Sequence, residues 1–400
     1  MKIVQINTFA NGSTGKLASS IHEMLLQEGH DAYFYYGLGA SDLKNAVRIC
    51  TPLSVHVHAV LSRYIGLQGY FSVFPTLKLL CELSRIEPDI IHLHNIHGSY
   101  VNWPLLFGFI ARKKIKIVMT LHDCCMFTGK CPHYAVVKCS KWKSECGSCP
   151  QLKRYPTSIF FDFTKKILAD KKKWFGKIEE CHIVTVSKWL EEQVKQSFLK
   201  KYDVQCIYNG IDTELFCPTN TTEVVKKYHL EGKFFVLGVA SEWSDNKGFK
   251  SFWELSQRLS EDEIIVLVGK NDDIRNRVND KFVLIDRTES QRDLAELYTN
   301  AGVLISFSQE ETFGLVLVEA MACGTPVIAV NSTASPELIF KDCGYLVEPG
   351  DIKSLRYAID DIRGSKIDFA SICRDEVCDR FSKNQMQIQY MELYSKVYKS

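Results

Sequence analysis

The string SQEETFGLVLVEAMACGTPVIAV at residues 308–330 contains Glu311 and Glu319, eight positions apart. We expect Gly314 to open a helix, so that Glu311 lies in the loop before it and Glu319 about one turn inside it. The free amides at a helix N-terminus bind anions, and carboxylates accept hydrogen bonds from sugar hydroxyls. Two carboxylates beside such an anion site could each bind one of two sugars that a diphosphate joins, while the helix amides bind the diphosphate. The alternative is that both are ordinary surface glutamates.

Further residues that could do chemistry follow predicted strands. The stretch GSTGK at 12–16 lacks the full spacing of a P-loop, so it predicts close approach of the backbone to phosphate and not ATP hydrolysis. His122 and Asp123 end the run IKIVMTL, where the imidazole could hydrogen-bond a substrate while the carboxylate orients it. His94 and His97 follow the strand-like run DIIHL and could supply polar groups to an acceptor. For each histidine the alternative is a structural role.

A cysteine-rich stretch, residues 122–150, carries six of the fifteen cysteines. Its C-x2-C pair has the geometry of a zinc knuckle. A complete four-thiolate set would comprise Cys131, Cys139, Cys146 and Cys149, in which Cys124 or His133 could replace one member. A structural zinc would explain how so long a loop stays ordered. Buried free thiols and a disulfide or redox role are the alternatives, and four thiolates would leave a zinc ion no open position for catalysis.

Short β-rich apolar runs alternate with helical patterns along the chain, and a second series of the same alternation begins after the string IDTELFCP. Near-continuous apolar strands between helices indicate parallel sheets that helices cover on both faces. Because 400 residues exceed one ordinary core, the sequence predicts an α/β protein with two doubly wound domains. Ligands of such folds bind beyond the carboxyl ends of the strands, so we expect the site there.

Composition and charge argue against several classes of protein. A net charge of +2 argues against a dedicated nucleic-acid binder. The N-terminal stretch has no signal-peptide pattern and no run reaches the roughly 18 apolar residues that span a bilayer, so we expect a cytoplasmic protein with reduced thiols. The basic, aromatic-rich stretch at 153–177 is either a solvated amphipathic helix or a contact for anionic lipid, which would place the protein peripherally on the inner membrane face.

Several motifs in order along the chain carry a family resemblance. They are TVSKW at 185–189, YNGID at 208–212, KG at 247–248 and the E-x7-E string described above. With these motifs the chain resembles the GT4 family of retaining glycosyltransferases, which have the GT-B fold. Its N-terminal half, from GSTGK through HLHNIHGSYVNWPLL to HDCCMFTGKC, resembles the subgroup used in capsule, exopolysaccharide and colanic-acid-type synthesis.

The resemblance implies two Rossmann-like domains that face each other across a cleft. Residues 1–215 would form the acceptor-side domain with the cysteine-rich insertion at 124–150, and residues 216–380 the nucleotide-sugar domain. Residues 381–400 would form a helix that packs back on the N-terminal domain. The expected reaction moves a sugar from a UDP- or GDP-linked donor to a saccharide or lipid-linked saccharide acceptor with retention of configuration, and no cofactor would be needed for catalysis.

The resemblance also implies roles for the residues that match the family's motifs. Glu311 would hold hydroxyls of the donor sugar, Glu319 the nucleotide ribose, and Lys247 the leaving diphosphate. The catalytic group would comprise Glu311, Lys247 and His122. Further donor contacts would come from Gly12, Ser13, Thr14, Gly15, Asn209, Gly210, Phe313, Gly314 and Leu315.

One position departs from the family pattern. Family members usually carry an arginine five residues before the lysine, where this chain has Glu242. A carboxylate would be repelled by a diphosphate, so we expect Glu242 to point elsewhere or to make another contact, with Lys270 or Arg275 as possible sources of the second cation. The alternatives to a transferase are a nucleotide-sugar epimerase or phosphorylase on the same fold, or a non-catalytic sugar-nucleotide-binding protein.

Overall fold

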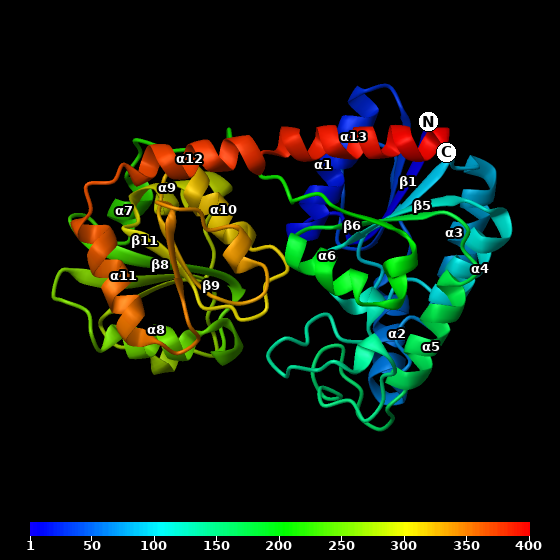
Figure 1. The fold of residues 1–400 in the computed structure, drawn as a ribbon, viewed down its shortest axis with the longest axis horizontal. Coiled ribbons are helices and arrows are strands. Elements are labelled where there is room, and N and C mark those ends of the chain that lie inside the picture. Colours follow the sequence, from blue (N-terminus) through cyan, green and yellow to red (C-terminus); the bar gives the residue numbers. More distant parts are fainter. The chain divides into compact units, whose positions relative to one another are not determined.

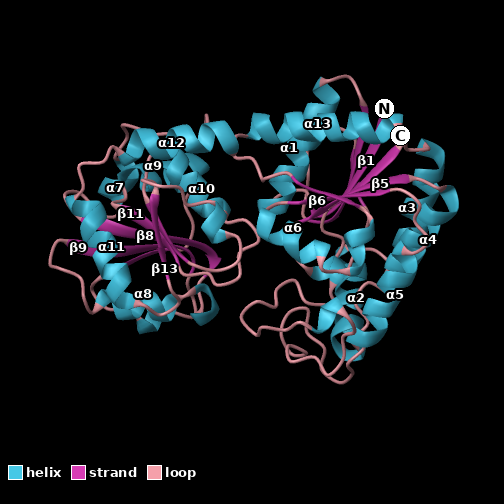
Figure 2. Cartoon of the chain, in the orientation of Figure 1, coloured by secondary structure: helices cyan, strands magenta, loops and turns pink.

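The computed structural model describes residues 1–400, with the side chain of Asn246 excepted. The chain divides into two compact units (Figure 1). Unit 1 comprises residues 1–208 and 386–400, and unit 2 comprises residues 209–385. Each unit contains one parallel sheet, and Figure 2 shows helices on both sides of the strands in each. The predicted α/β architecture with two parallel sheets is therefore confirmed.

Unit 1 is built on a seven-stranded sheet with the strand order β3-β2-β1-β4-β5-β6-β7. The strands are β1 (Lys2–Phe9), β2 (Asp31–Leu38), β3 (Ala46–Arg48), β4 (Ile90–Leu93), β5 (Lys116–Leu121), β6 (Cys181–Thr185) and β7 (Asp203–Cys206). The α-helices are α1 (Ser13–Gln27), α2 (Pro52–Ile65), α3 (Val73–Ile86), α4 (Trp103–Lys113), α5 (Thr164–Phe175) and α6 (Lys188–Lys195), and the 3-10 helices are η1 (Cys125–Phe127), η2 (Lys141–Lys143) and η3 (Phe198–Lys201). The strand order reverses between β1 and β4, so the loops after these two strands flank the crevice where such sheets bind ligands.

Unit 2 is built on a six-stranded sheet with the strand order β10-β9-β8-β11-β12-β13. The strands are β8 (Phe234–Glu242), β9 (Glu263–Lys270), β10 (Phe282–Ile285), β11 (Val303–Ser306), β12 (Val327–Val330) and β13 (Gly344–Val347). The α-helices are α7 (Glu223–Lys227), α8 (Phe249–Ser256), α9 (Gln291–Asn300), α10 (Leu315–Ala322), α11 (Ile352–Gly364) and α12 (Phe369–Arg380), and the 3-10 helices are η4 (Asp245–Lys247), η5 (Arg275–Arg277) and η6 (Ser335–Glu337). Here the order reverses between β8 and β11, which places the loops after these strands at the ligand-binding edge.

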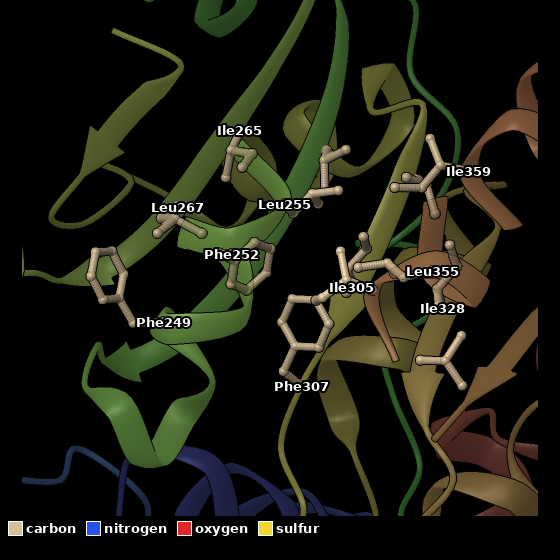
Figure 3. Close-up of a cluster of buried hydrophobic side chains, with 14 of the residues drawn as sticks. Phe249, Phe252, Leu255, Ile265, Leu267, Ile305, Phe307, Ile328, Leu355 and Ile359 are labelled. Atoms are coloured by element: carbon tan, nitrogen blue, oxygen red, sulfur yellow. The ribbon is translucent and has the colours of Figure 1, made fainter. Parts of the chain in front are cut away.

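A hydrophobic core between the sheet and the helices of unit 2 holds its loops in place (Figure 3). Phe252 of α8 and Phe307, which directly follows β11, pack edge to face with ring centroids 4.7 Å apart. Ile265, Leu267 and the other strand residues of this core are almost fully buried. Because Phe307 belongs to this core, the loop that follows β11 starts from a fixed point.

The last helix, α13 (Lys383–Lys399), contributes residues 386–399 to unit 1. Two buried tyrosines attach it to the sheet. The Tyr394 hydroxyl lies 2.6 Å from His92 Nδ1, and the Tyr390 hydroxyl lies 2.8 Å from Thr120 Oγ1. Since these partners lie on β4 and β5, the C-terminal segment is part of the unit 1 core.

A search of the described residues for membrane spans finds no helix with the length and apolar character that crossing a bilayer requires.

Candidate active site

The N-terminus of α10 forms one half of the candidate site in unit 2. Gly314 precedes the helix with a φ of 109°, in the left-handed region that favours glycine. A Cβ atom at this position would also lie 3.2 Å from side-chain atoms of both Leu317 and Leu338. The helix therefore begins sharply at Leu315. The Leu317 amide donates to the Gly314 carbonyl at 3.0 Å, which leaves the amides of Leu315 and Val316 without a partner in the helix. Such amides can bind an anion such as a phosphate.

The carboxylate of Glu311 is held beside this helix N-terminus. The Glu311 amide donates to Thr333 Oγ1 at 3.0 Å, and its carbonyl accepts from the Ala334 amide at 3.2 Å. Its carboxylate forms an ion pair with Lys247, whose Nζ lies 3.5 Å from Oε1. Both side chains stay open to a ligand, since Lys247 is 42% exposed and Glu311 is 24% exposed. The structure thus brings together a cation and a carboxylate that lie 64 residues apart in sequence.

Packing of the unit 2 core positions Lys247. Lys247 ends the 3-10 helix η4, and Gly248 follows it with a φ of 83°. A Cβ atom at Gly248 would lie 2.2 Å from the Cβ of Phe307, so only glycine lets this loop approach the start of the Glu311 loop. Trp243 anchors the other end of the loop, because its buried indole donates to the Val268 carbonyl at 3.0 Å. The two loops at the sheet reversal are therefore packed against each other.

Glu319 lies on α10, inside the helix as predicted, and Tyr298 of α9 holds its carboxylate. The Tyr298 hydroxyl donates to Glu319 Oε2 at 3.0 Å. Burial and the neighbouring carboxylate raise the pKa of Tyr298, so the phenol stays protonated and remains a donor. Sequence reasoning missed Tyr298, since a tyrosine at a core position of an amphipathic helix carries no signal for such a role.

The acid at the usual arginine position has a lysine partner. Glu242 ends β8 beside Lys270 of β9, and Lys270 Nζ lies 3.5 Å from Glu242 Oε1 and 3.4 Å from Asp272 Oδ2. Arg275, the other candidate for a second cation, pairs with Asp286 at 2.6 Å. Each of these two cations is thus already engaged with carboxylates of unit 2.

Asn209 and Gly210 are placed at the first residues of unit 2, directly before a short parallel bridge between Ile211 and Ser382. Two backbone hydrogen bonds close this bridge, from the Ile211 amide to the Phe381 carbonyl at 2.8 Å and from the Lys383 amide to the Ile211 carbonyl at 2.7 Å. Asn209 is largely buried. The bridge therefore fixes the segment that carries both residues.

In unit 1, the predicted phosphate-binding loop follows β1 and leads into α1. Gly12 precedes the helix with a φ of 81°, and Ser13 and Thr14 form its first turn. A Cβ atom at Gly15 would lie 2.8 Å from the Ala10 carbonyl carbon, so glycine allows the helix to start against the end of the strand. The helix N-terminus therefore lies at the reversal of the unit 1 sheet, where phosphate binding is expected.

Two neutral histidines follow β4 and β5 at the same edge. His94 Nδ1 lies 3.3 Å from His122 Nε2, and the Gln5 side-chain amide lies 3.1 Å from His94 Nε2. Burial lowers the pKa of His122 to about 4. Burial also lowers the pKa of His94, and the neighbouring His92 and His122 lower it further. Both imidazoles are therefore uncharged at neutral pH, and both ring nitrogens of His94 are engaged by His122 and Gln5.

A charged pair lies beside the neutral one. His97 Nε2 lies 2.7 Å from Asp123 Oδ2, and Asp123 Oδ1 accepts from the Cys125 amide at 2.7 Å. Burial opposes ionisation of Asp123, but the charge and hydrogen bond of His97 outweigh it and lower the pKa of Asp123 to about 2. Burial likewise opposes protonation of His97, and Asp123 outweighs it and raises the pKa of His97. Tyr155, which sequence reasoning missed, has its hydroxyl 3.5 Å from His97 Nδ1.

The cysteine-rich stretch gathers its thiols without forming disulfides. None of the fifteen cysteines forms a disulfide in the part of the chain that the structure describes. The four predicted zinc ligands, Cys131, Cys139, Cys146 and Cys149, line one cavity of about 20 Å³ together with Trp142. Among the residues that the structure describes, no group of three histidine, cysteine or acidic side chains is arranged to hold a metal ion. The stretch contains only two short 3-10 helices, η1 and η2, as expected of a long loop.

Comparisons with known proteins identify the family. The model described as Glycosyltransferase Family 4 matches residues 15–215, and the model described as Glycosyl transferases group 1 matches residues 220–384. The putative colanic acid biosynthesis glycosyl transferase WcaC of Escherichia coli K12 is 25% identical over 89% of each chain. The N-acetyl-α-D-glucosaminyl L-malate synthase of Bacillus anthracis is 24% identical over 96% of this chain and 93% of its own.

Solved structures share the fold. Sucrose-phosphate synthase from Thermosynechococcus elongatus has a TM-score of 0.72 at 17% identity, over 99% of both chains. HepE of Anabaena, in complex with UDP-glucose, has a TM-score of 0.69 at 16% identity, over 99% of this chain and 100% of its own. The GT-B fold and the resemblance predicted from the sequence are thereby confirmed. The chain belongs to glycosyltransferase family 4, and it is a glycosyltransferase with the GT-B fold.

Proposed function

We propose that this enzyme transfers a sugar from a nucleoside-diphosphate sugar to a saccharide or lipid-linked saccharide, with retention of configuration, in the synthesis of a cell-surface polysaccharide. One observation carries the proposal. The Lys247 ammonium and the Glu311 carboxylate lie 3.5 Å apart, and the loop of Glu311 leads directly into the N-terminus of α10. A cation, a carboxylate and free amides are the groups that a diphosphate joined to a sugar requires.

In the proposed reaction the departing nucleoside diphosphate gains negative charge. Lys247 and the first-turn amides of α10 stabilise this charge as it develops. The Glu311 carboxylate, freed from Lys247 by the phosphate, accepts hydrogen bonds from the donor sugar. Retention follows if the acceptor attacks the face from which the phosphate leaves, so that a phosphate oxygen takes the acceptor's proton. Glu319, oriented by Tyr298, binds the ribose.

We propose a UDP-linked donor in preference to a GDP-linked one. The support comes from the structural neighbour HepE, which was solved in complex with UDP and with UDP-glucose. The putative WcaC glycosyl transferase, a relative over most of its length, supports an acceptor from polysaccharide synthesis.

We assign the acceptor side to the histidine-rich edge of unit 1. The neutral His122 would exchange a hydrogen bond with an acceptor hydroxyl, and His94, held between His122 and Gln5, would position it. The ion pair of His97 with Asp123 supports their loop. Reduced thiols are typical of the cytoplasm, so the fifteen cysteines, none of them in a disulfide among the described residues, support a cytoplasmic location. A lipid-linked acceptor would bring the enzyme to the inner membrane face.

We also propose that the cysteine-rich stretch takes up one structural zinc ion. Its support is the single small cavity that Cys131, Cys139, Cys146 and Cys149 line. Four thiolates bind zinc tetrahedrally and would order the loop. Elemental analysis should find one zinc per chain, and a Cys146→Ser, Cys149→Ser variant should lose both the zinc and thermal stability. A zinc-free wild-type protein with the same melting temperature as this variant would contradict the proposal.

A donor screen tests the proposed function. The purified protein is mixed with UDP-, GDP-, ADP- and dTDP-sugars, and the melting temperature and the release of nucleoside diphosphate are measured. We expect a shift with UDP-sugars, because a ligand that binds only the folded state stabilises it. Glu311→Gln should abolish transfer, whereas the neighbouring Glu310→Gln is the matched control and should retain it. Normal transfer by Glu311→Gln would refute the site, and turnover of the donor to an isomer would favour an epimerase.

A further inference from the structure

Helix α2 (Pro52–Ile65) faces solvent with its apolar side. Its exposed residues Leu53, Val57, Val60, Leu61 and Tyr64 follow the i, i+4, i+7, i+8 spacing of one helix face. Its buried residues are polar, namely His58 and Ser62. An amphipathic helix on a soluble protein normally buries its apolar face, so this orientation needs a partner outside the fold.

Polar contacts fix α2 in this orientation. His58 Nδ1 lies 2.7 Å from Ser72 Oγ, and the His58 ring packs edge to face on Phe71 at 5.4 Å. The Ser62 hydroxyl donates to the Leu67 carbonyl at 3.3 Å. Hydrogen bonds of His58 Nδ1 and the Ser62 hydroxyl therefore hold the inward face of α2, and a rotation of the helix would break them. Among the described residues, His58 Nε2 has no partner.

The segment at residues 159–161 extends the exposed apolar face. The Ile159 amide donates to the Arg63 carbonyl at 2.9 Å, and the Phe160 ring stacks on Tyr64 at 5.8 Å. Phe160 is 67% exposed. We call this surface the α2 face, and its members are Leu53, Val57, Val60, Leu61, Tyr64, Ile159, Phe160 and Phe161.

The two stretches of sequence that carry the α2 face contain cations and no acidic residue. No acidic residue occurs between Asp42 and Glu82, or between Glu145 and Asp162. The exposed cations of these two stretches include Arg63, Lys78, Lys153 and Arg154. None of these four forms an ion pair with any other residue of the described chain. They are therefore available to anions of an external partner.

From this arrangement we propose that the α2 face binds the surface of an anionic lipid bilayer. A helix of 14 residues is about 21 Å long, which is shorter than the roughly 30 Å of a bilayer core, so α2 would lie in the plane of the headgroups. Apolar side chains would enter the acyl boundary while the surrounding cations meet anionic headgroups. A second copy of the chain is disfavoured as the partner, because a symmetric contact would bring these cations together.

This inference deepens the proposed function, from which it takes the lipid-linked acceptor. Figure 1 shows α2 on the side of unit 1 opposite to α13, so the C-terminal helix does not cover this face. Such a surface would keep the enzyme where a lipid-linked acceptor is presented.

Co-sedimentation with vesicles tests the proposal on the full chain without donor. One vesicle type contains phosphatidylcholine with phosphatidylglycerol, and the other contains phosphatidylcholine alone. The test variant is Leu53→Ser, Leu61→Ser, Phe160→Ser. The control variant, Tyr357→Ser, Ile388→Ser, Tyr398→Ser, changes three apolar residues that are exposed elsewhere.

We expect wild type and control to sediment with the anionic vesicles, and the test variant to bind at least about tenfold more weakly because each side chain contributes apolar burial. An Arg63→Gln, Lys153→Gln, Arg154→Gln variant should lose the preference for anionic vesicles. Amide exchange of wild-type residues 52–65 and 158–161 should slow on vesicle binding. Donor-induced thermal shifts should be the same in all variants. A wild-type protein that binds vesicles but shows no thermal shift with any donor would contradict the proposed function and not the membrane contact.

Any of the following results would overturn the proposal. The first is a wild-type protein that does not bind anionic vesicles. The second is a correctly melting test variant that binds them as wild type does, or wild-type amide exchange that is unchanged in α2. The third is a dimer in sedimentation velocity that the test variant dissociates, which would make the α2 face an interface between copies of the chain.

Discussion

Replacing Lys247 by methionine removes the positive charge beside the N-terminus of α10 and keeps most of the side-chain volume. In an ion pair at about 4 Å and an effective dielectric constant of about 20, one unit charge is worth about 4 kcal/mol. Lys247 is 42% exposed, and solvent screening reduces this value. We therefore expect a loss of about 2–4 kcal/mol of transition-state stabilisation, which corresponds to a fall of about 30-fold to 1000-fold in kcat/KM.

The same change should leave the fold nearly untouched. The partner of Lys247 in the free enzyme is Glu311, and exposed ion pairs contribute about 0–1 kcal/mol to the free energy of unfolding. The assay is nucleoside diphosphate release at varied donor concentration, with urea unfolding measured in parallel. The matched control is Lys250→Met, because Lys250 is an exposed lysine of α8 that pairs only with Glu254 among the described residues.

A Lys247→Met enzyme with kcat/KM within threefold of wild type would refute the assignment of this lysine to the diphosphate. So would an equal loss in Lys250→Met, since a general effect of surface charge would then explain both. A large fall in stability would show instead that the ion pair is structural.

Three further changes test the packing, the donor carboxylate and the acceptor edge. Gly248→Ala should lower the free energy of unfolding by about 2–4 kcal/mol in urea, because its Cβ would meet Phe307 at 2.2 Å in a left-handed backbone; wild-type stability would contradict this packing. Tyr298→Phe should raise KM for the donor about three- to tenfold with kcat little changed, since the α10 carboxylate loses its donor; an unchanged KM would argue against a ribose contact. His97→Gln should cost about 3 kcal/mol of stability at pH 6 through loss of its pair with Asp123. The pKa of His97 is raised in the folded state, so the stability that the ion pair contributes is complete below the ordinary value of 6.5 and is lost as pH rises through the folded-state pKa. A stability difference between wild type and His97→Gln that grows above pH 7 would contradict the ion pair.

Sequence patterns were sufficient for the fold class and the family. Apolar strand runs between helical stretches predicted two parallel sheets, and the structure contains them. The string around Glu311 and Glu319 predicted a carboxylate before a helix and another inside it, which is how α10 is arranged. These predictions succeed because apolar periodicity and a helix-opening glycine act over short ranges of sequence.

Contacts between segments that are distant in sequence could not be predicted from the sequence. Nothing in the string around Glu319 identifies Tyr298 as its partner, because the two meet only once α9 packs beside α10. The pairing of Glu242 with Lys270 likewise depends on the register of β8 against β9. The thiols of the cysteine-rich loop could be grouped by spacing, but spacing does not fix their directions, and the described residues include no metal-binding arrangement.

Helix α2 shows why periodicity alone cannot assign a face. Its sequence places apolar residues on one side and Ser54, His58 and Ser62 on the other, so the standard expectation buries the apolar side. The structure does the reverse, because the inner side of α2 meets the Ser72 hydroxyl and not a hydrophobic core. A buried imidazole without a hydrogen bond would be costly, so His58 holds the helix in this orientation. The apolar side is then left to solvent or to a partner, and the surrounding cations favour an anionic membrane as that partner.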